Sequence, residues 1–191
     1  MADAVDAAGI NPSSFDIFEF VRQRKQAHGE FGLGRLTRLA QDLPPQPDGD
    51  AGRISWSIAG ELGELGQPVL RLRIQAQSEL ECQRCLRPMA WPLRVDVRLQ
   101  PVVDEAELDD EAPLDEEDFD ADLPEKVLGS RRFDLLAQIE DELILVIPYV
   151  PRHEVCPDGR SDASTEKAPD ERRPSPFAAL AGLKRGETGK Q

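Results

Sequence analysis

Two long stretches of alternating polar and apolar residues flank a short segment that contains two cysteines. From residue 70 to residue 82 the apolar side chains occupy the even positions, with Ser78 as an exception. From residue 91 to residue 99 they occupy the odd positions. A period of two residues is typical of a strand that buries one face. The pattern therefore predicts a long antiparallel hairpin over about 69–103, with the segment CQRCLRPM at its tip.

Shorter patterns predict the other regular elements. The segment 54–62 alternates in the same way and predicts a third strand. Residues 15–27 and 36–43 carry apolar side chains at helical spacing, so we expect two short N-terminal helices. The strongest helical pattern spans about 134–147, where apolar residues recur at i, i+3, i+7 and i+11. We therefore expect an α+β fold, in which an antiparallel sheet built on the hairpin is packed by these helices.

Most of the excess negative charge lies in one segment. The chain has 191 residues and a formal net charge of −14, and residues 104–125 hold 13 of its 37 acids and no lysine or arginine. The rest of the chain has 24 acids against 23 bases. A self-repelling segment without apolar periodicity predicts a solvated acidic loop. The net charge therefore does not exclude a nucleic-acid partner for the remaining surface.

The pattern predicts one α+β domain over residues 1–156, which includes the acidic loop, followed by a flexible linker and docking segment over 157–191. The linker is rich in charged residues, serine and proline. The first residues lack the basic start and the following apolar run that are typical of a signal peptide. The longest aliphatic run, 143–147, is too short to span a membrane. These features predict a cytoplasmic protein.

All three cysteines and one of the two histidines occur in two close pairs. Cys82 and Cys85 lie at the predicted hairpin tip, and His153 and Cys156 follow the long helix. A Cys3His set is a complete tetrahedral ligand set for zinc. His153 is only six residues from the helix end, a reach of at most about 20 Å. We therefore predict that the four side chains converge in a structural zinc site.

Two other interpretations of the cysteines stay open at this point. In the first, Cys82 packs on the core face that its parity predicts, and Cys85 and Cys156 are ordinary thiols. A redox-active pair is less favoured, because that chemistry needs the first cysteine at a helix N-terminus and the flanks here read as strands.

Arginines gather on the polar faces of the two hairpin strands and around the tip. Such a stripe can follow a phosphate backbone. The alternative is an ordinary solvated face with arginines paired to Glu79, Glu81 and Asp96. The residues that we predict to bind RNA or another partner are Arg71, Arg73, Arg84, Arg87, Arg94, Arg98, Arg152, Phe177, Lys184 and Arg185.

No catalytic motif is recognisable in the chain. The glycines at 29, 32 and 34 lack the Lys-Ser/Thr pair of a phosphate-binding loop, and two histidines do not complete a Ser/His/Asp arrangement. The acidic loop lacks the packed surroundings that hold catalytic carboxylates in place. We therefore expect a protein that is not an enzyme, with a nuclease acting through a divalent metal as the remaining enzymatic alternative.

Three separated segments resemble the bacterial YceD family, whose members are described as large ribosomal RNA subunit accumulation proteins. The segments are ECQRCLRPM, FDLLAQIEDELILVIPYVPRHEVC and SPFAALAGLKR, in the family's order. Members from other bacterial groups carry a second cysteine pair where this chain has His153 and Cys156. The resemblance assigns no catalytic residue.

The resemblance implies a cytoplasmic, non-enzymatic factor in the synthesis, processing or stability of large-subunit ribosomal RNA. Its partner would be precursor RNA or an early ribosomal protein, with no membrane and no small-molecule substrate. An alternative from another class is a protein-binding adaptor that acts through the acidic loop and the C-terminal segment without contacting RNA.

Overall fold

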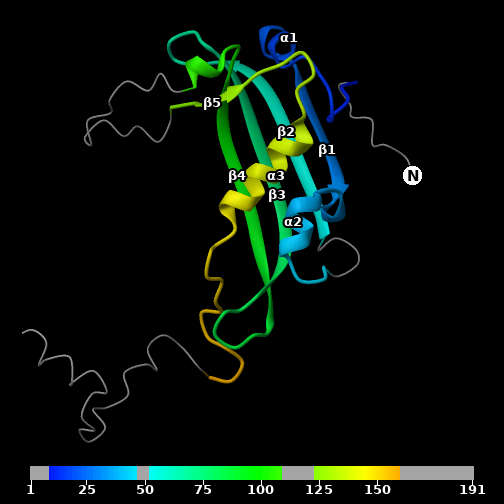
Figure 1. Ribbon diagram of the computed structural model, residues 1–191, viewed down its shortest axis with the longest axis vertical. Coiled ribbons are helices and arrows are strands. Elements are labelled where there is room, and N and C mark those ends of the chain that lie inside the picture. Colours follow the sequence, from blue (N-terminus) through cyan, green and yellow to red (C-terminus); the bar gives the residue numbers. More distant parts are fainter. Residues whose placement is uncertain (1–8, 47–51, 109–122, 160–191) are drawn as a thin grey trace, which may run out of the picture. The chain divides into compact units, whose positions relative to one another are not determined.

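A computed structural model describes residues 9–46, 52–108 and 123–159 of the chain (Figure 1). Five strands form one sheet in the order β1-β2-β3-β4-β5. The strands are β1 Gln26–Gly32, β2 Arg53–Leu62, β3 Pro68–Glu81, β4 Pro88–Val102 and β5 Glu125–Leu128. The helices are α1 Ile17–Arg22, α2 Thr37–Asp42 and α3 Leu135–Val146, with short 3-10 turns η1 Leu33–Arg35 and η3 Glu105–Glu107. The predicted α+β class is confirmed.

The long hairpin and the third strand occur where the alternation predicts them. β3 pairs antiparallel with β4, with Ile74 opposite Val95, and β2 pairs antiparallel with β3. The even-numbered side chains Leu70, Leu72 and Ile74 are fully buried. The odd-numbered neighbours therefore face the other side of the sheet, as a two-residue period requires.

The edge of the sheet beyond β4 departs from the purely antiparallel arrangement that we expected. β5 pairs parallel with β4, with Leu99 opposite Glu125, so the sheet is mixed. β5 begins at Glu125, the last residue of the predicted acidic loop 104–125. Near the start of that loop lies η3, with Asp104 as its N-cap. A strand of four residues is too short to show a period in the sequence, which explains why it was not predicted.

The first predicted helix is shorter than the pattern 15–27 suggested. α1 ends at Arg22, Arg24 takes a positive φ of 50°, and the chain then enters β1. β1 pairs with β2, and the Gly60 N–H donates to the Lys25 carbonyl at 2.9 Å. The helical prediction for the last residues of 15–27 was wrong because pairing with β2 outweighs local helical preference.

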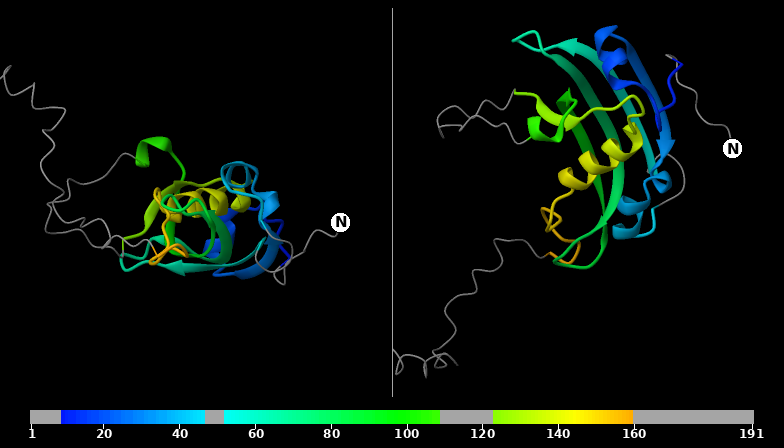
Figure 2. Two further views of the ribbon diagram at one scale, coloured as in Figure 1. Left: turned by 90° about the horizontal axis from the view of Figure 1, so that it is seen from below. Right: turned by 45° about the horizontal axis from the view of Figure 1, so that its top comes forward.

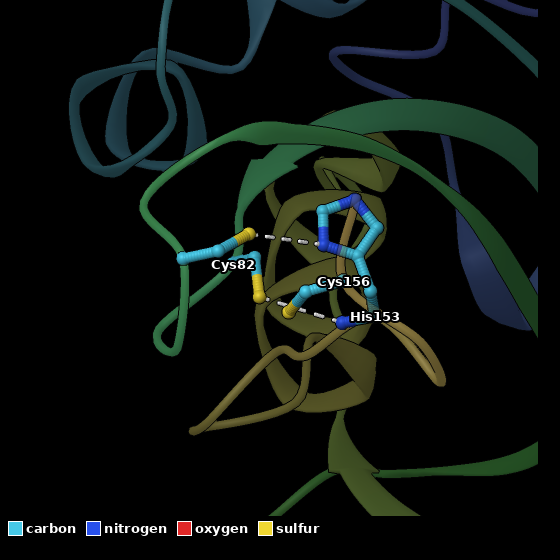
Figure 3. Close-up of side chains that lie close together, drawn as sticks. Cys82, His153 and Cys156 are labelled. Carbon is cyan, nitrogen blue, oxygen red and sulfur yellow. Dashed lines mark hydrogen bonds between the residues drawn. The ribbon is translucent and has the colours of Figure 1, made fainter. Parts of the chain in front are cut away.

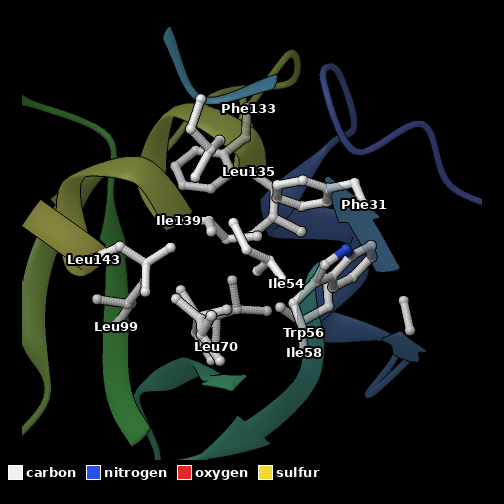
Figure 4. Packing of buried hydrophobic residues seen from close by; sticks show 14 of the residues in the cluster. Phe31, Ile54, Trp56, Ile58, Leu70, Leu99, Phe133, Leu135, Ile139 and Leu143 are labelled. Carbon is white, nitrogen blue, oxygen red and sulfur yellow. The ribbon is translucent and has the colours of Figure 1, made fainter. Parts of the chain in front are cut away.

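The helices cover one face of the twisted sheet, and α3 packs against β4 (Figure 2). Between them lies a core that includes Ile54, Trp56, Leu99 and Ile139 (Figure 4). The opposite face carries the polar residues of β3 and β4 and has no helix over it among the described residues. One broad face of the sheet is thus open to a partner.

Contacts within the chain divide it into a compact unit of residues 1–153 and a second unit from Glu154 onward. In the second unit, residues 154–159 are described, and they form a turn in which the Gly159 N–H donates to the Cys156 carbonyl at 2.8 Å. No helix in the described part of the chain is long and apolar enough to cross a membrane.

Candidate metal centre and open sheet face

The tip between β3 and β4 is a tight turn closed by its own backbone. The Cys82 N–H donates to the Arg87 carbonyl at 3.0 Å, and the Leu86 N–H donates to the Cys82 carbonyl at 2.8 Å. Leu86 has a φ of 57°, in the left-handed region that non-glycine residues seldom adopt. This turn brings Cys82 and Cys85 close together.

The chain that leaves α3 runs back to this tip. The Gln83 N–H donates to the Pro151 carbonyl at 2.9 Å, and the Arg84 guanidinium donates to the His153 carbonyl. Pro148 and Pro151 restrict the backbone between the helix and these contacts. The exit from α3 is therefore anchored on the tip at two successive points, and His153 is placed beside the cysteines.

Three candidate metal ligands of the first unit lie within contact distance of one another. Cys85 Sγ is 3.5 Å from His153 Nδ1, and the His153 backbone N–H donates to Cys82 Sγ at 3.4 Å. Cys156 follows three residues later, and the ligand atoms of all four residues lie within 4.8 Å of one another. Figure 3 shows Cys82, His153 and Cys156 pointing toward one another. The predicted grouping of the four side chains is present.

The surroundings of Cys82 favour a thiolate. Burial by itself would raise the pKa of this thiol, but the backbone N–H groups of His153, Arg84 and Cys85 and the His153 side chain lower it to about 5. Thiolates are the form in which cysteine binds zinc, and several N–H groups commonly donate hydrogen bonds to such thiolates. The ligand types, their spacing and the local hydrogen bonds therefore fit zinc.

The spacing of the ligand atoms also fits a tetrahedral zinc ion. Ligands at about 2.3 Å from a tetrahedral ion lie about 3.8 Å apart, and the 3.5 Å between Cys85 Sγ and His153 Nδ1 is close to this value. Cys82, Cys85 and Cys156 form no disulfide with one another. Cys82 and Cys85 flank a hairpin turn and not a helix N-terminus, which disfavours the redox alternative.

The open sheet face carries a cluster of arginines around one acid. Asp96 accepts from Arg71 Nε at 2.9 Å and from Arg73 Nε at 3.1 Å. The Arg71 hydrogen bond is the main cause that holds the pKa of Asp96 below its ordinary value. Arg98 lies opposite Arg71 in the register, and Arg94 lies opposite Gln75. The four predicted arginines of β3 and β4 thus share one face, on which Asp96 balances part of their charge.

Of the other predicted binding residues, three are described and lie elsewhere in the fold. Arg84, Arg87 and Arg152 belong to the tip and to the exit from α3. Phe177, Lys184 and Arg185 lie outside the described residues.

The acids of α3 do not form a catalytic cluster. The Glu140 carboxylate accepts from the backbone of α2 and from Arg38, and Glu142 accepts from Gln138 Nε2 at 2.8 Å. Among the described residues, no group of three or more acids is arranged to hold a metal ion. The nuclease alternative therefore gains no support from these side chains.

Fold and site together define a small α+β protein with an arginine-rich open sheet and a cysteine–histidine tip. The profile of the family described as "Large ribosomal RNA subunit accumulation protein YceD" matches residues 70–184. A curated protein of that name from Haemophilus influenzae is 33% identical over 177 residues, which cover 91% of this chain and 95% of the relative. The chain belongs to the YceD family. No solved structure matches it.

Proposed function

We propose that this chain is a non-enzymatic, cytoplasmic factor that promotes accumulation of large-subunit ribosomal RNA by binding precursor RNA through the open face of its sheet. The name shared by the family and the Haemophilus influenzae relative supports a role in the accumulation of this RNA. The observation that carries the binding mode is the cluster Arg71, Arg73, Arg94 and Arg98 on adjacent strands of an uncovered face.

The shape and charge of this face suit a large polyanion. Arginine guanidinium groups bind phosphate oxygens through paired hydrogen bonds, and their charge displaces counterions from RNA. A shallow hollow of about 320 Å³ on the same face is lined by Arg53, Gln75 and Arg94 among others, and also by Glu30, which pairs with Arg53 at 3.0 Å. A broad, polar and shallow surface favours an extended strand or helix of RNA over a small molecule.

The tip serves this function as a structural element. A zinc ion held by Cys82, Cys85, His153 and Cys156 would supply a cross-link between the hairpin tip and the chain that leaves α3. The protein's own contacts already prepare this link, because Gln83 and Arg84 hold the exit segment through its carbonyl groups. The link would fix the far ends of β3 and β4, the strands that carry the arginine cluster.

The test is titration of purified full-length protein with a transcribed fragment of large-subunit RNA at several salt concentrations. The double variant Arg73→Glu/Arg94→Glu should bind at least about tenfold more weakly and show a shallower salt dependence, since each lost phosphate contact removes about 0.7–0.9 from the log–log slope. The variant Arg22→Glu/Lys25→Glu changes the charge equally, at exposed positions around α1. Salt-insensitive binding, or equal losses in both variants, would contradict the proposal and favour the adaptor alternative.

A further inference from the structure

The end of α3 and the segment after it expose an unusual amount of apolar surface. Residues 144–150 read ILVIPYV, a run without a single polar or charged side chain other than the tyrosine hydroxyl. Leu145 is 75% exposed and Tyr149 is 98% exposed, and their neighbours Ile144, Val146 and Val150 are also exposed. Consecutive exposed apolar residues are rare in a soluble domain unless they bind a partner.

Beside this segment lies a groove of about 440 Å³. Its walls come from three separate parts of the first unit: Leu43 just after α2, Leu80 near the end of β3, and Ile147 and Tyr149 on the exit from α3. Leu80 belongs to the buried face of β3, so the groove opens at one end of the core. A side chain inserted there would extend the packing of the core.

The polar part of the groove is acidic. Asp42 and Glu81 line it, and no lysine or arginine does. Among the described residues neither carboxylate forms an ion pair, whereas Asp96 and Glu140 elsewhere in the fold are both paired with arginine. Two unpaired carboxylates next to apolar walls repel phosphates and attract cationic side chains.

The groove is also held in shape before any partner arrives. Tyr149 lies between Pro148 and Pro151, and the Pro151 carbonyl is fixed by the Gln83 N–H at 2.9 Å. Prolines and this anchor reduce the freedom of the backbone, so less entropy is lost when Tyr149 is covered. Exposed, preorganised tyrosines of this kind are frequent central contacts of protein interfaces.

We propose that this groove binds a basic protein segment that carries apolar side chains, with Tyr149 covering the apolar part and Asp42 and Glu81 pairing with its cations. The groove shares no lining residue with the hollow on the arginine face of the sheet. The protein would thus bring a basic protein and an RNA together through two different surfaces. The probe is the mixture of RNA-free proteins extracted from purified large ribosomal subunits. The proposal rests on the proposed function only in this choice of probe.

The experiment compares retention of these proteins by immobilised full-length protein and by three variants, followed by titration of each retained protein after purification. Tyr149→Ser removes the apolar contact, and Asp42→Asn/Glu81→Gln removes the charges. Leu65→Ser is the matched control, because Leu65 is 91% exposed in the turn between β2 and β3. For at least one basic protein, we expect Tyr149→Ser to reduce the binding affinity tenfold or more. The charge variant should also reduce this affinity, and Leu65→Ser should leave it unchanged.

Other outcomes would overturn the proposal. Equal retention by wild type and Tyr149→Ser, or no retained protein, would show that the groove does not bind such a segment. A loss of RNA affinity with Tyr149→Ser and no loss of protein affinity would make it an RNA site. Tighter protein binding after Phe177→Ser would show that the chain's own tail is the natural occupant. The proposed function is tested separately, by the RNA affinity of Arg73→Glu/Arg94→Glu. Its failure can therefore be distinguished from failure of the groove proposal, which is measured as protein affinity.

Discussion

Glu140 of α3 caps the N-terminus of α2, about one hundred residues earlier in the chain. Its Oε1 accepts the backbone N–H groups of Arg38 at 2.7 Å and of Leu39 at 3.1 Å, and its Oε2 accepts Arg38 Nε at 2.9 Å. The N-cap position of α2 is Leu36, which has no side-chain acceptor for these donors. A nearly buried carboxylate of one helix thus completes the other and ties the N-terminal segment to α3.

Glu140→Gln should destabilise the protein by about 1–3 kcal/mol at neutral pH, because a charged acceptor of three hydrogen bonds becomes neutral. Burial opposes ionisation of Glu140, but the N–H groups of Leu39 and Arg38 and the Arg38 guanidinium lower its pKa below the ordinary 4.5. The carboxylate therefore contributes its full stability above pH 4.5, and the contribution is lost as the pH falls through the lowered value. Urea unfolding at pH 7 and near pH 3.5 measures both effects.

Asp141→Asn is the control for this prediction. Asp141 accepts from Arg38 Nη1 at 2.7 Å, but both side chains are about half exposed, so its loss should cost less than about 1 kcal/mol. Equal losses in the two variants, or a loss in Glu140→Gln that does not shrink in acid, would show that the cap is unimportant.

Gly60→Ala should cost about 1–3 kcal/mol through overpacking. A Cβ at this position of β2 would lie 2.8 Å from Val21 Cα and 3.0 Å from the Phe20 carbonyl oxygen, both in the backbone of α1. Backbone atoms cannot move aside as a flexible side chain does. Gly32→Ala, where a Cβ meets nothing within 4 Å, should change the stability by less than about 0.5 kcal/mol. Thermal unfolding measures the melting temperatures of the two variants. Equal shifts in the two melting temperatures would argue against close packing of α1 on β2.

Asp96→Asn should strengthen RNA binding several-fold, because it removes the acid that balances Arg71 and Arg73 on the open face. Stability should fall by less than about 1 kcal/mol, since the pairs are partly exposed. Glu64→Gln in the turn between β2 and β3 changes the net charge equally and should leave RNA affinity nearly unchanged. Titration with the same RNA fragment measures both variants, and weaker binding by Asp96→Asn would place the RNA elsewhere.

Protein purified without a histidine tag should contain about one zinc ion per chain by elemental analysis. Cys85→Ser and His153→Gln should lose the metal, and chelation should lower the melting temperature of the wild type, since the ion links two segments. His28→Gln, at the chain's other histidine, should keep it. Zinc-free wild-type protein with an unchanged melting temperature in chelator would show that the four side chains act as ordinary thiols and imidazole.

Local patterns predicted the parts of the fold that depend on neighbours in the sequence. The alternation around Leu72 and Val95 specified both the strands and their buried faces, and the short reach from α3 to His153 was enough to predict the grouping at the tip. β1 was missed because its glycines show no alternation, and it is a strand only through its pairing with β2. The roles of Glu140 and Tyr149 depend on segments far away in the chain, which no local period reveals.

The most direct test of the central claim is ultraviolet crosslinking in cells, followed by identification of the protein residues attached to RNA and sequencing of that RNA. The account predicts crosslinked peptides from β3 and β4 that include Arg73 or Arg94, attached to large-subunit precursor sequence. The signal should fall in the Arg73→Glu/Arg94→Glu variant at equal protein abundance and persist in Arg22→Glu/Lys25→Glu. Crosslinks confined to other segments, or no RNA recovered above the background of an uncrosslinked sample, would contradict RNA binding by the open face of the sheet.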